Sequence, residues 1–131
     1  MNAPADTSAG HEFEVSLRRR DDVEHNRVLL DIMVETTREF SAYGYRIELR
    51  EAFDAEGRRI DVELGGITLP SIAAASSGRA SGTCSIRMPV DGTYALRIGR
   101  KQRSADFSMR IVDGIPLPLG NADGGFVKLV E

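Results

Sequence analysis

Apolar and polar side chains alternate along residues 82–111 in a pattern that predicts three β-strands. Each run places an apolar residue at every second position: Cys84, Ile86 and Met88; Tyr94, Leu96 and Ile98; Phe107, Met109 and Ile111. A period of two is typical of strands that bury one face and leave the other in water. Residues 89–92 supply a first turn, because proline fixes φ and glycine accepts positive φ, and residues 100–105 supply a second.

The same alternation recurs in the first half of the chain. A first strand begins with Phe13, Val15 and Leu17 and ends in the charged residues 18–22. Residues 45–53 and 59–64 alternate in the same way, and residues 54–57 between them have the composition of a hairpin turn. We expect two antiparallel strands here, with their rows of charged side chains forming a solvated face.

Residues 27–40 form the most apolar run of the chain, and we interpret them as a central strand. The run is rich in β-branched residues and lacks the i, i+3, i+4, i+7 stripe of an amphipathic helix. Val28, Leu30, Ile32 and Val34 share one face. Leu29 and Met33 fall on the second face, where we expect a loop or a partner to cover them.

The C-terminal residues predict a further strand and an edge. Residues 115–119 contain two prolines, which cannot donate to a strand ladder. They therefore belong on an edge strand of the same sheet or, alternatively, in an extended arm that pairs with a neighbouring molecule. Residues 126–130 follow a glycine-rich turn and form the last strand.

These elements define the fold class that the sequence predicts. With 131 residues and 13 glycines, the chain has the length of one domain and a composition that favours strands and turns. We predict a single antiparallel β-sandwich of about seven to nine strands, immunoglobulin-like or jelly-roll-like, over residues 11–131. Residues 1–10 are small and polar and are expected to form a disordered tail.

Composition narrows the cellular setting and the chemistry. No apolar run is long enough to span a membrane, and the N-terminal residues lack the basic and apolar regions of a signal peptide. The expectation is therefore a cytoplasmic protein without a membrane partner, or an exported one if a signal peptide has been removed. One cysteine, Cys84, excludes an internal disulfide and predicts a buried, inert thiol.

Catalytic and cofactor motifs are missing from the sequence. No phosphate-binding glycine loop, HExxH, GxSxG or CxxC occurs, so no enzyme activity and no cofactor are predicted. His11 and His25 have no metal-ligand spacing. Asn121 and Asp123 resemble the start of a calcium loop, but the same residues suit a plain β-turn, which is the preferred interpretation.

Two segments qualify as partner-binding sites. Arg97, Arg100, Lys101 and Arg103, with Arg110 nearby, concentrate positive charge at a hairpin tip that suits a phosphate, an acidic glycan or an acidic protein surface. The alternative is a merely soluble tip. The second segment, residues 65–82, is rich in Gly, Ser and Ala. Its candidate partner-binding residues are the apolar ones, Ile67, Leu69 and Ile72. This long segment is either a binding loop or a plain crossover between sheets.

Residues 82–111 resemble bacterial immunoglobulin-like and pre-peptidase C-terminal β-sandwich modules. The resemblance lies in PVDGTYALRI at 89–98, which would join two late strands, and in DFSMRI at 106–111, a third. The resemblance implies a β-sandwich without catalytic activity, and it assigns no functional residue to this chain.

The function that we predict from the sequence is a non-enzymatic binding or assembly module with a protein partner. Self-association through residues 115–131 is one form of it. A carbohydrate-binding module is the alternative, although the absence of Trp and the presence of only 3 Tyr leave little for a sugar-stacking platform. A small hydrolase-type enzyme ranks third. Nucleic acid is not expected as a partner, because the net charge is −3 and no aromatic residues interleave with the basic ones.

Overall fold

The computed structural model describes residues 11–40, 46–68 and 78–130, and these residues form nine strands and no helix. The strand number agrees with the seven to nine expected, and the all-β class is confirmed. In chain order the strands are β1 (Phe13–Asp22), β2 (Arg27–Phe40), β3 (Arg46–Asp54), β4 (Arg59–Thr68), β5 (Gly78–Arg87), β6 (Gly92–Arg100), β7 (Arg103–Val112), β8 (Ile115–Leu119) and β9 (Val127–Val130).

The strands form one mixed sheet in the order β8-β7-β6-β4-β3-β5-β2-β1-β9, which corrects the prediction of an antiparallel sandwich. Four hairpins, β1–β2, β3–β4, β6–β7 and β7–β8, are antiparallel as expected. The pairs β1–β9, β3–β5 and β4–β6 are parallel. Side chains alternate with a period of two in both kinds of pair, so the sequence pattern could not distinguish them.

The turn expected at residues 89–92 does not join neighbouring strands. β5 pairs with β2 and β3, whereas β6 pairs with β4 and β7. The chain between β5 and β6 therefore crosses the ends of β3 and β4 instead of closing a hairpin. The Ala95 N–H donates to the Arg58 carbonyl at 2.9 Å, and this bond places the start of β6 beside the β3–β4 turn.

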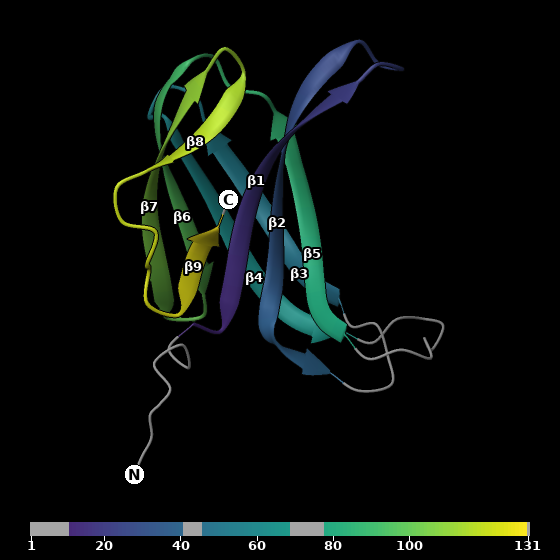
Figure 1. Ribbon diagram of the computed structural model, residues 1–131, viewed down its shortest axis with the longest axis vertical. Helices are drawn as coiled ribbons and strands as arrows, with labels where there is room; N and C mark the ends of the chain where they lie inside the picture. Colours follow the sequence, from purple (N-terminus) through teal and green to yellow (C-terminus); the bar gives the residue numbers. More distant parts are fainter. Residues whose placement is uncertain (1–10, 41–45, 69–77, 131) are drawn as a thin grey trace.

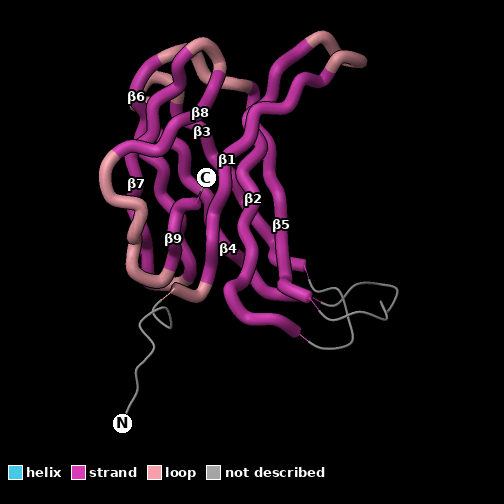
Figure 2. Tube along the Cα trace, in the orientation of Figure 1, coloured by secondary structure: helices cyan, strands magenta, loops and turns pink. Residues whose placement is uncertain are grey.

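The sheet curls round into a nearly closed barrel (Figure 1). Its two outer strands, β8 and β9, lie one above the other between β7 and β1, and the tube view shows the same arrangement (Figure 2). β9 pairs with the first residues of β1, from Phe13 to Ser16. Further along β1, Arg19 donates to the carbonyl oxygens of Asp113 and Gly114, each at 3.4 Å. β1 is thus the strand against which both ends of the sheet close.

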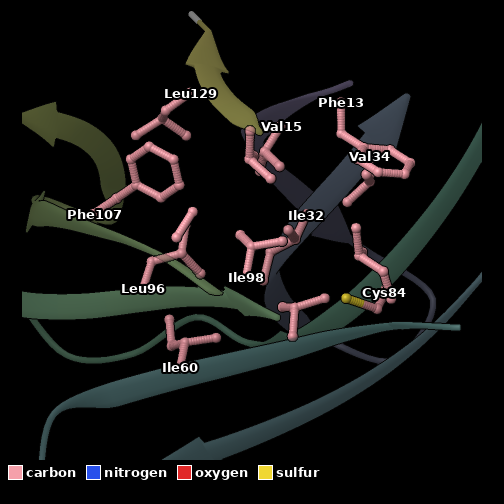
Figure 3. Packing of buried hydrophobic residues seen from close by; sticks show 14 of the residues in the cluster. Phe13, Val15, Ile32, Val34, Ile60, Cys84, Leu96, Ile98, Phe107 and Leu129 are labelled. Atoms are coloured by element: carbon pink, nitrogen blue, oxygen red, sulfur yellow. The ribbon is translucent and has the colours of Figure 1, made fainter. Parts of the chain in front are cut away.

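The core fills the inside of this curled sheet with the apolar side chains that the alternation predicted to be buried (Figure 3). Leu30, Ile32, Leu96, Ile98 and Met109 are completely inaccessible to solvent. Burial of such side chains is the main favourable term in folding. On the second face of β2, Leu29 is also buried, and it lies in register between Arg20 of β1 and Arg87 of β5. Side chains of the two neighbouring strands therefore flank Leu29 on this face.

Both ends of the segment 65–82 belong to strands, which corrects its interpretation as one long loop. β4 continues to Thr68 and β5 begins at Gly78, so the connection between them is about half the length expected. At Gly82 the backbone passes so close to the Ile47 carbonyl oxygen that a Cβ atom would collide with it. Glycine is therefore required at Gly82 for β3 and β5 to meet.

Candidate functional site

The basic tip of the β6–β7 hairpin is largely engaged in internal contacts. Arg97 donates to Asp106 at 2.9 Å, and Arg103 makes a two-pronged pair with the Glu12 carboxylate at 2.6 and 3.1 Å. Arg100 lies 3.8 Å from the same carboxylate. These contacts hold the pKa of Glu12 below its usual value, mainly through the hydrogen bond from Arg103, and raise the pKa of Arg103.

Two arginines of this tip also pack on aromatic rings across the barrel. The Arg100 guanidinium lies 5.3 Å from the centre of the Phe13 ring, and the Arg103 guanidinium lies 4.4 Å from that of Phe126. The two rings themselves meet edge to face at 6.3 Å. Arg100 and Arg103 thus help to close the barrel.

Of the remaining predicted site residues, Lys101 lies in the turn of the tip and Ile67 lies in β4. Lys101 is exposed and has no ion pair in the described part of the chain. Ile67 pairs with Ile47 and packs against the core from β4. Leu69 and Ile72 lie outside the described residues. The structure therefore gives Ile67 a role in packing.

A hollow of about 430 Å³ lies over the irregular part of the β3–β4 ladder. Its lining consists of Glu48, Leu49, Arg50, Glu63 and Gly65. Within the described residues, the three charged side chains make no hydrogen bond or ion pair, although Arg50 and Glu63 are opposite each other in register. Their hydrogen-bonding capacity faces solvent. Among the described residues, no aromatic side chain lines the hollow.

Exposed large apolar side chains gather at one end of the barrel, which we call the hairpin end. Of the described residues, the large hydrophobic ones that are exposed are Val23, Phe53, Val90, Val112, Ile115 and Leu117. They lie in or beside the β1–β2, β3–β4 and β7–β8 turns and the 88–91 segment. Figure 1 shows these turns at the end of the barrel opposite the β6–β7 tip.

Hydrogen bonds connect the β7–β8 turn of the hairpin end to the 88–91 segment and to β1. The Asp91 carboxylate accepts from the backbone N–H groups of Asp113 and Gly114 at 2.9 and 3.2 Å. Arg19 binds the carbonyls of the same two residues from the other side. The Tyr94 hydroxyl donates to the Val90 carbonyl at 2.6 Å. The β7–β8 turn and the 88–91 segment are therefore held in place by side chains from three separate strands or segments.

The outer face of the β7–β8 hairpin is the most continuous apolar part of this end. Val112 is directly opposite Ile115, and Arg110 is directly opposite Leu117, so all four side chains share one face. The three apolar residues are 39%, 51% and 45% exposed. Arg110 is exposed and has no hydrogen bond or ion pair with any described residue. A cation without a partner thus stands within an apolar surface.

Sequence reasoning missed the hairpin end, although the chain contains a signal for it. Ile111 and Val112 are consecutive apolar residues, which breaks the alternation at the point where β7 should present a polar side chain. Val23 and Val90 occupy turn positions in which polar residues are usual. Only the fold shows that these separate irregularities lie at the same end.

The other chemistry-bearing residues have structural roles. Cys84 is unpaired and buried, and burial raises the pKa of its thiol to about 12. Asp123 accepts from the Gly125 N–H and contacts the His11 ring at 2.9 Å. These contacts accord with the plain turn preferred for residues 121–125. Residues 11–40, 46–68 and 78–130 contain no group of three or more His, Cys, Asp or Glu side chains that could hold a metal ion.

Comparison with models of known protein families finds no match for this chain, and comparisons with curated proteins and with solved structures also find none. Within the described residues, no helix has the length and apolar character needed to cross a membrane.

Proposed function

We propose that this protein is a non-enzymatic assembly module that binds a protein surface through its hairpin end. The observation that carries this proposal is the gathering of six exposed large hydrophobic residues at one end of an otherwise charged surface. Scattered apolar residues are ordinary on protein surfaces, whereas their concentration in one region is typical of interaction sites.

The construction of the hairpin end supports the same proposal. Asp91, Arg19 and Tyr94 satisfy backbone groups of the β7–β8 turn and of Val90, so this part of the surface is ordered before any partner arrives. A preorganised surface loses less conformational entropy on binding than a mobile one. The mixture of apolar side chains with the exposed Arg110 also resembles the composition of interfaces between proteins that associate reversibly.

Site-specific photo-cross-linking tests this function, because it captures a partner whose identity is unknown. A photoreactive amino acid replaces Val23, Val90 or Leu117 in the protein expressed in its native cells, and the same replacement at Lys101 serves as the control at the opposite end. We expect a defined cross-linked species from the hairpin-end positions and none from Lys101. Cross-linking that is equal at all four positions, or absent from all, would contradict the proposal.

A carbohydrate-binding function is the second candidate, and the hollow over the β3–β4 ladder is the observation that favours it. Glu48, Arg50 and Glu63 offer acceptors and donors that no described residue uses. Binding of sugars to the protein, monitored by amide chemical shifts, would test it. Shifts confined to the residues of the hollow would support this candidate, and unchanged spectra at millimolar sugar would remove it.

A further inference from the structure

The exposed face of the β7–β8 hairpin carries both a cation and an anion beside its apolar centre. We call this surface the β7–β8 strip and define it as Arg110, Val112, Asp113, Ile115 and Leu117. Val112 and Ile115 are the paired residues on either side of the turn, and Asp113 is in the turn itself. The side chains of Arg110 and Asp113 have no hydrogen bond or ion pair with other described residues. Both charges therefore remain available to a partner.

A partner must contact the side chains of the strip, because the outer edge of β8 cannot pair with another strand. Val112 and Ile115 flank a two-residue turn, so the backbone groups of Ile115, Leu117 and Leu119 point towards β7. Pro116 and Pro118 occupy the alternate positions that point outwards, and proline has no N–H to donate. An added strand would find no donors along this edge.

The other outer strand, β9, is covered by the chain itself. The Gly124 N–H donates to the Val127 carbonyl at 2.8 Å, and the Leu129 N–H donates to the Ala122 carbonyl at 2.8 Å. Asp123 forms an isolated bridge with Lys128 on the same side. Residues 122–124 thus occupy the edge that a neighbouring strand would need. Association through the C-terminal segment must therefore use side chains on a face instead of an edge ladder.

The turn that presents Asp113 is rigidly built. Asp113 and Gly114 both have positive φ, at 53° and 71°, as a two-residue hairpin turn requires. Their N–H groups bind Asp91, and their carbonyls bind Arg19. The backbone of the turn is therefore held from two sides, while the Asp113 side chain has no partner among the described residues.

We infer that the occupant of the β7–β8 strip is the same strip of a second copy of this chain. In a two-fold dimer every contact occurs twice: if one residue contacts a second residue of the other copy, the second residue of the first copy contacts the first residue of the other. With the axis passing near Val112, each Arg110 meets the Asp113 of the other copy, and the apolar side chains pack between the two ion pairs. The strip is self-complementary in charge, which a surface with only one sign of charge would not be.

This inference rests on the proposed assembly function and gives that function a definite partner. The strip alone is smaller than the roughly 800 Å² per partner of a standard interface, so a weak and reversible dimer is expected. Sedimentation velocity over a range from about 10 µM to about 1 mM covers the affinities usual for such small contacts. The mass should rise from 14.3 kDa towards twice that value as the concentration increases.

Charge exchange tests the pairing of Arg110 with Asp113 directly. Arg110→Asp gives each strip two anions, and Asp113→Lys gives it two cations, so each variant should lose self-association at least tenfold. Lysine suits the second position, because Lys101 already adopts a φ of 57° in this fold. A mixture of the two variants should restore a dimer, since an all-anionic strip then meets an all-cationic one. Lys101→Asp removes the same charge at the opposite end and should leave association unchanged.

The possible outcomes separate this inference from the proposed function. Loss in each single variant and recovery in the mixture would support it, provided that circular dichroism shows both variants folded. A wild-type protein that stays monomeric throughout, an Arg110→Asp variant that still associates, or a mixture without recovery would overturn it. If the protein is monomeric while photo-cross-linking from Leu117 captures a different protein, the assembly function stands and only the identity of the partner is wrong.

Discussion

Glu12 shows how one side chain connects parts of the chain that are 91 residues apart in sequence. Its carboxylate pairs with Arg103, and Arg100 approaches it as well. Glu12→Gln keeps the shape but loses the charge, so we expect the Tm to fall by about 2–5 °C at neutral pH. Glu56→Gln, at an exposed turn position without an ion pair to any described residue, is the matched control and should leave the Tm unchanged.

The pH dependence of this effect has a definite sign. Folding lowers the pKa of Glu12 from its ordinary value of 4.5. The stabilisation is therefore fully present above that value and is lost as the pH falls through the lowered pKa of the folded state. The Tm difference between wild type and Glu12→Gln should accordingly close in acid. A difference that persists at the same size at about pH 2, or grows there, would show that Glu12 acts through something other than its charge.

Cys84 gives a second prediction at the scale of a residue. Because burial raises its pKa to about 12, almost no thiolate forms in the folded protein at pH 8, and the side chain is only 8% exposed. We expect alkylation by iodoacetamide at pH 8 to be at least about a hundredfold slower in the folded protein than in denaturant. Since the chain has one cysteine, mass spectrometry of the intact protein measures the rate directly. Equal rates in the two states would contradict the buried position.

At the scale of elements, the parallel contact between β3 and β5 depends on a glycine. A Cβ atom at Gly82 would collide with the Ile47 carbonyl oxygen, whereas one at Gly66 in β4 would meet no atom of the described residues within 4 Å. Gly82→Ala should therefore lower the free energy of unfolding by more than about 2 kcal/mol. Gly66→Ala should change it by less than about 0.5 kcal/mol. Urea denaturation of both variants provides the measurement, and two equal effects would argue against the close crossing.

The elements themselves were accessible from sequence, but their neighbours were not. The alternation of Tyr94, Leu96 and Ile98 identified β6 and its buried face correctly. It also suggested a hairpin with the strand before it, whereas the structure pairs β6 with β4 and β7. A turn sequence such as that of residues 89–92 reverses the chain locally. Whether the next strand returns beside the last one depends on which apolar faces remain to be covered.

At the scale of the whole molecule, β9 completes the barrel with few residues. Leu129 is 3% exposed and packs in the core, although β9 has only four residues. Leu129→Ala should lower the free energy of unfolding by about 2–5 kcal/mol, because the cavity lies in a closed core. Leu117→Ala removes the same atoms from a 45% exposed position and should cost less than about 1 kcal/mol. Thermal and urea unfolding should show this order, and a reversed order would contradict the assigned burial.

The candidate sites were less predictable than the core. Arg100 and Arg103 were correctly placed at a hairpin tip, but their partners Glu12 and Phe126 come from distant segments. Charge counted along the sequence cannot show whether a distant carboxylate neutralises it. For the hairpin end the sequence shows only separate irregularities at Val23, Val90 and Val112, and these residues lie at one end of the barrel only because the fold brings their turns there.

The sequence by itself determined the strand class, most of the strand positions and the inward-facing side chains, because the period-two pattern is a local property of each segment. It also indicated Cys84 as an inert thiol. Tertiary structure decided the strand order, the parallel pairs and the closing of the barrel at β1, because these depend on contacts between residues far apart in the chain. For the same reason it turned the basic tip into a structural contact and made the β7–β8 strip the surface through which a second copy is proposed to bind.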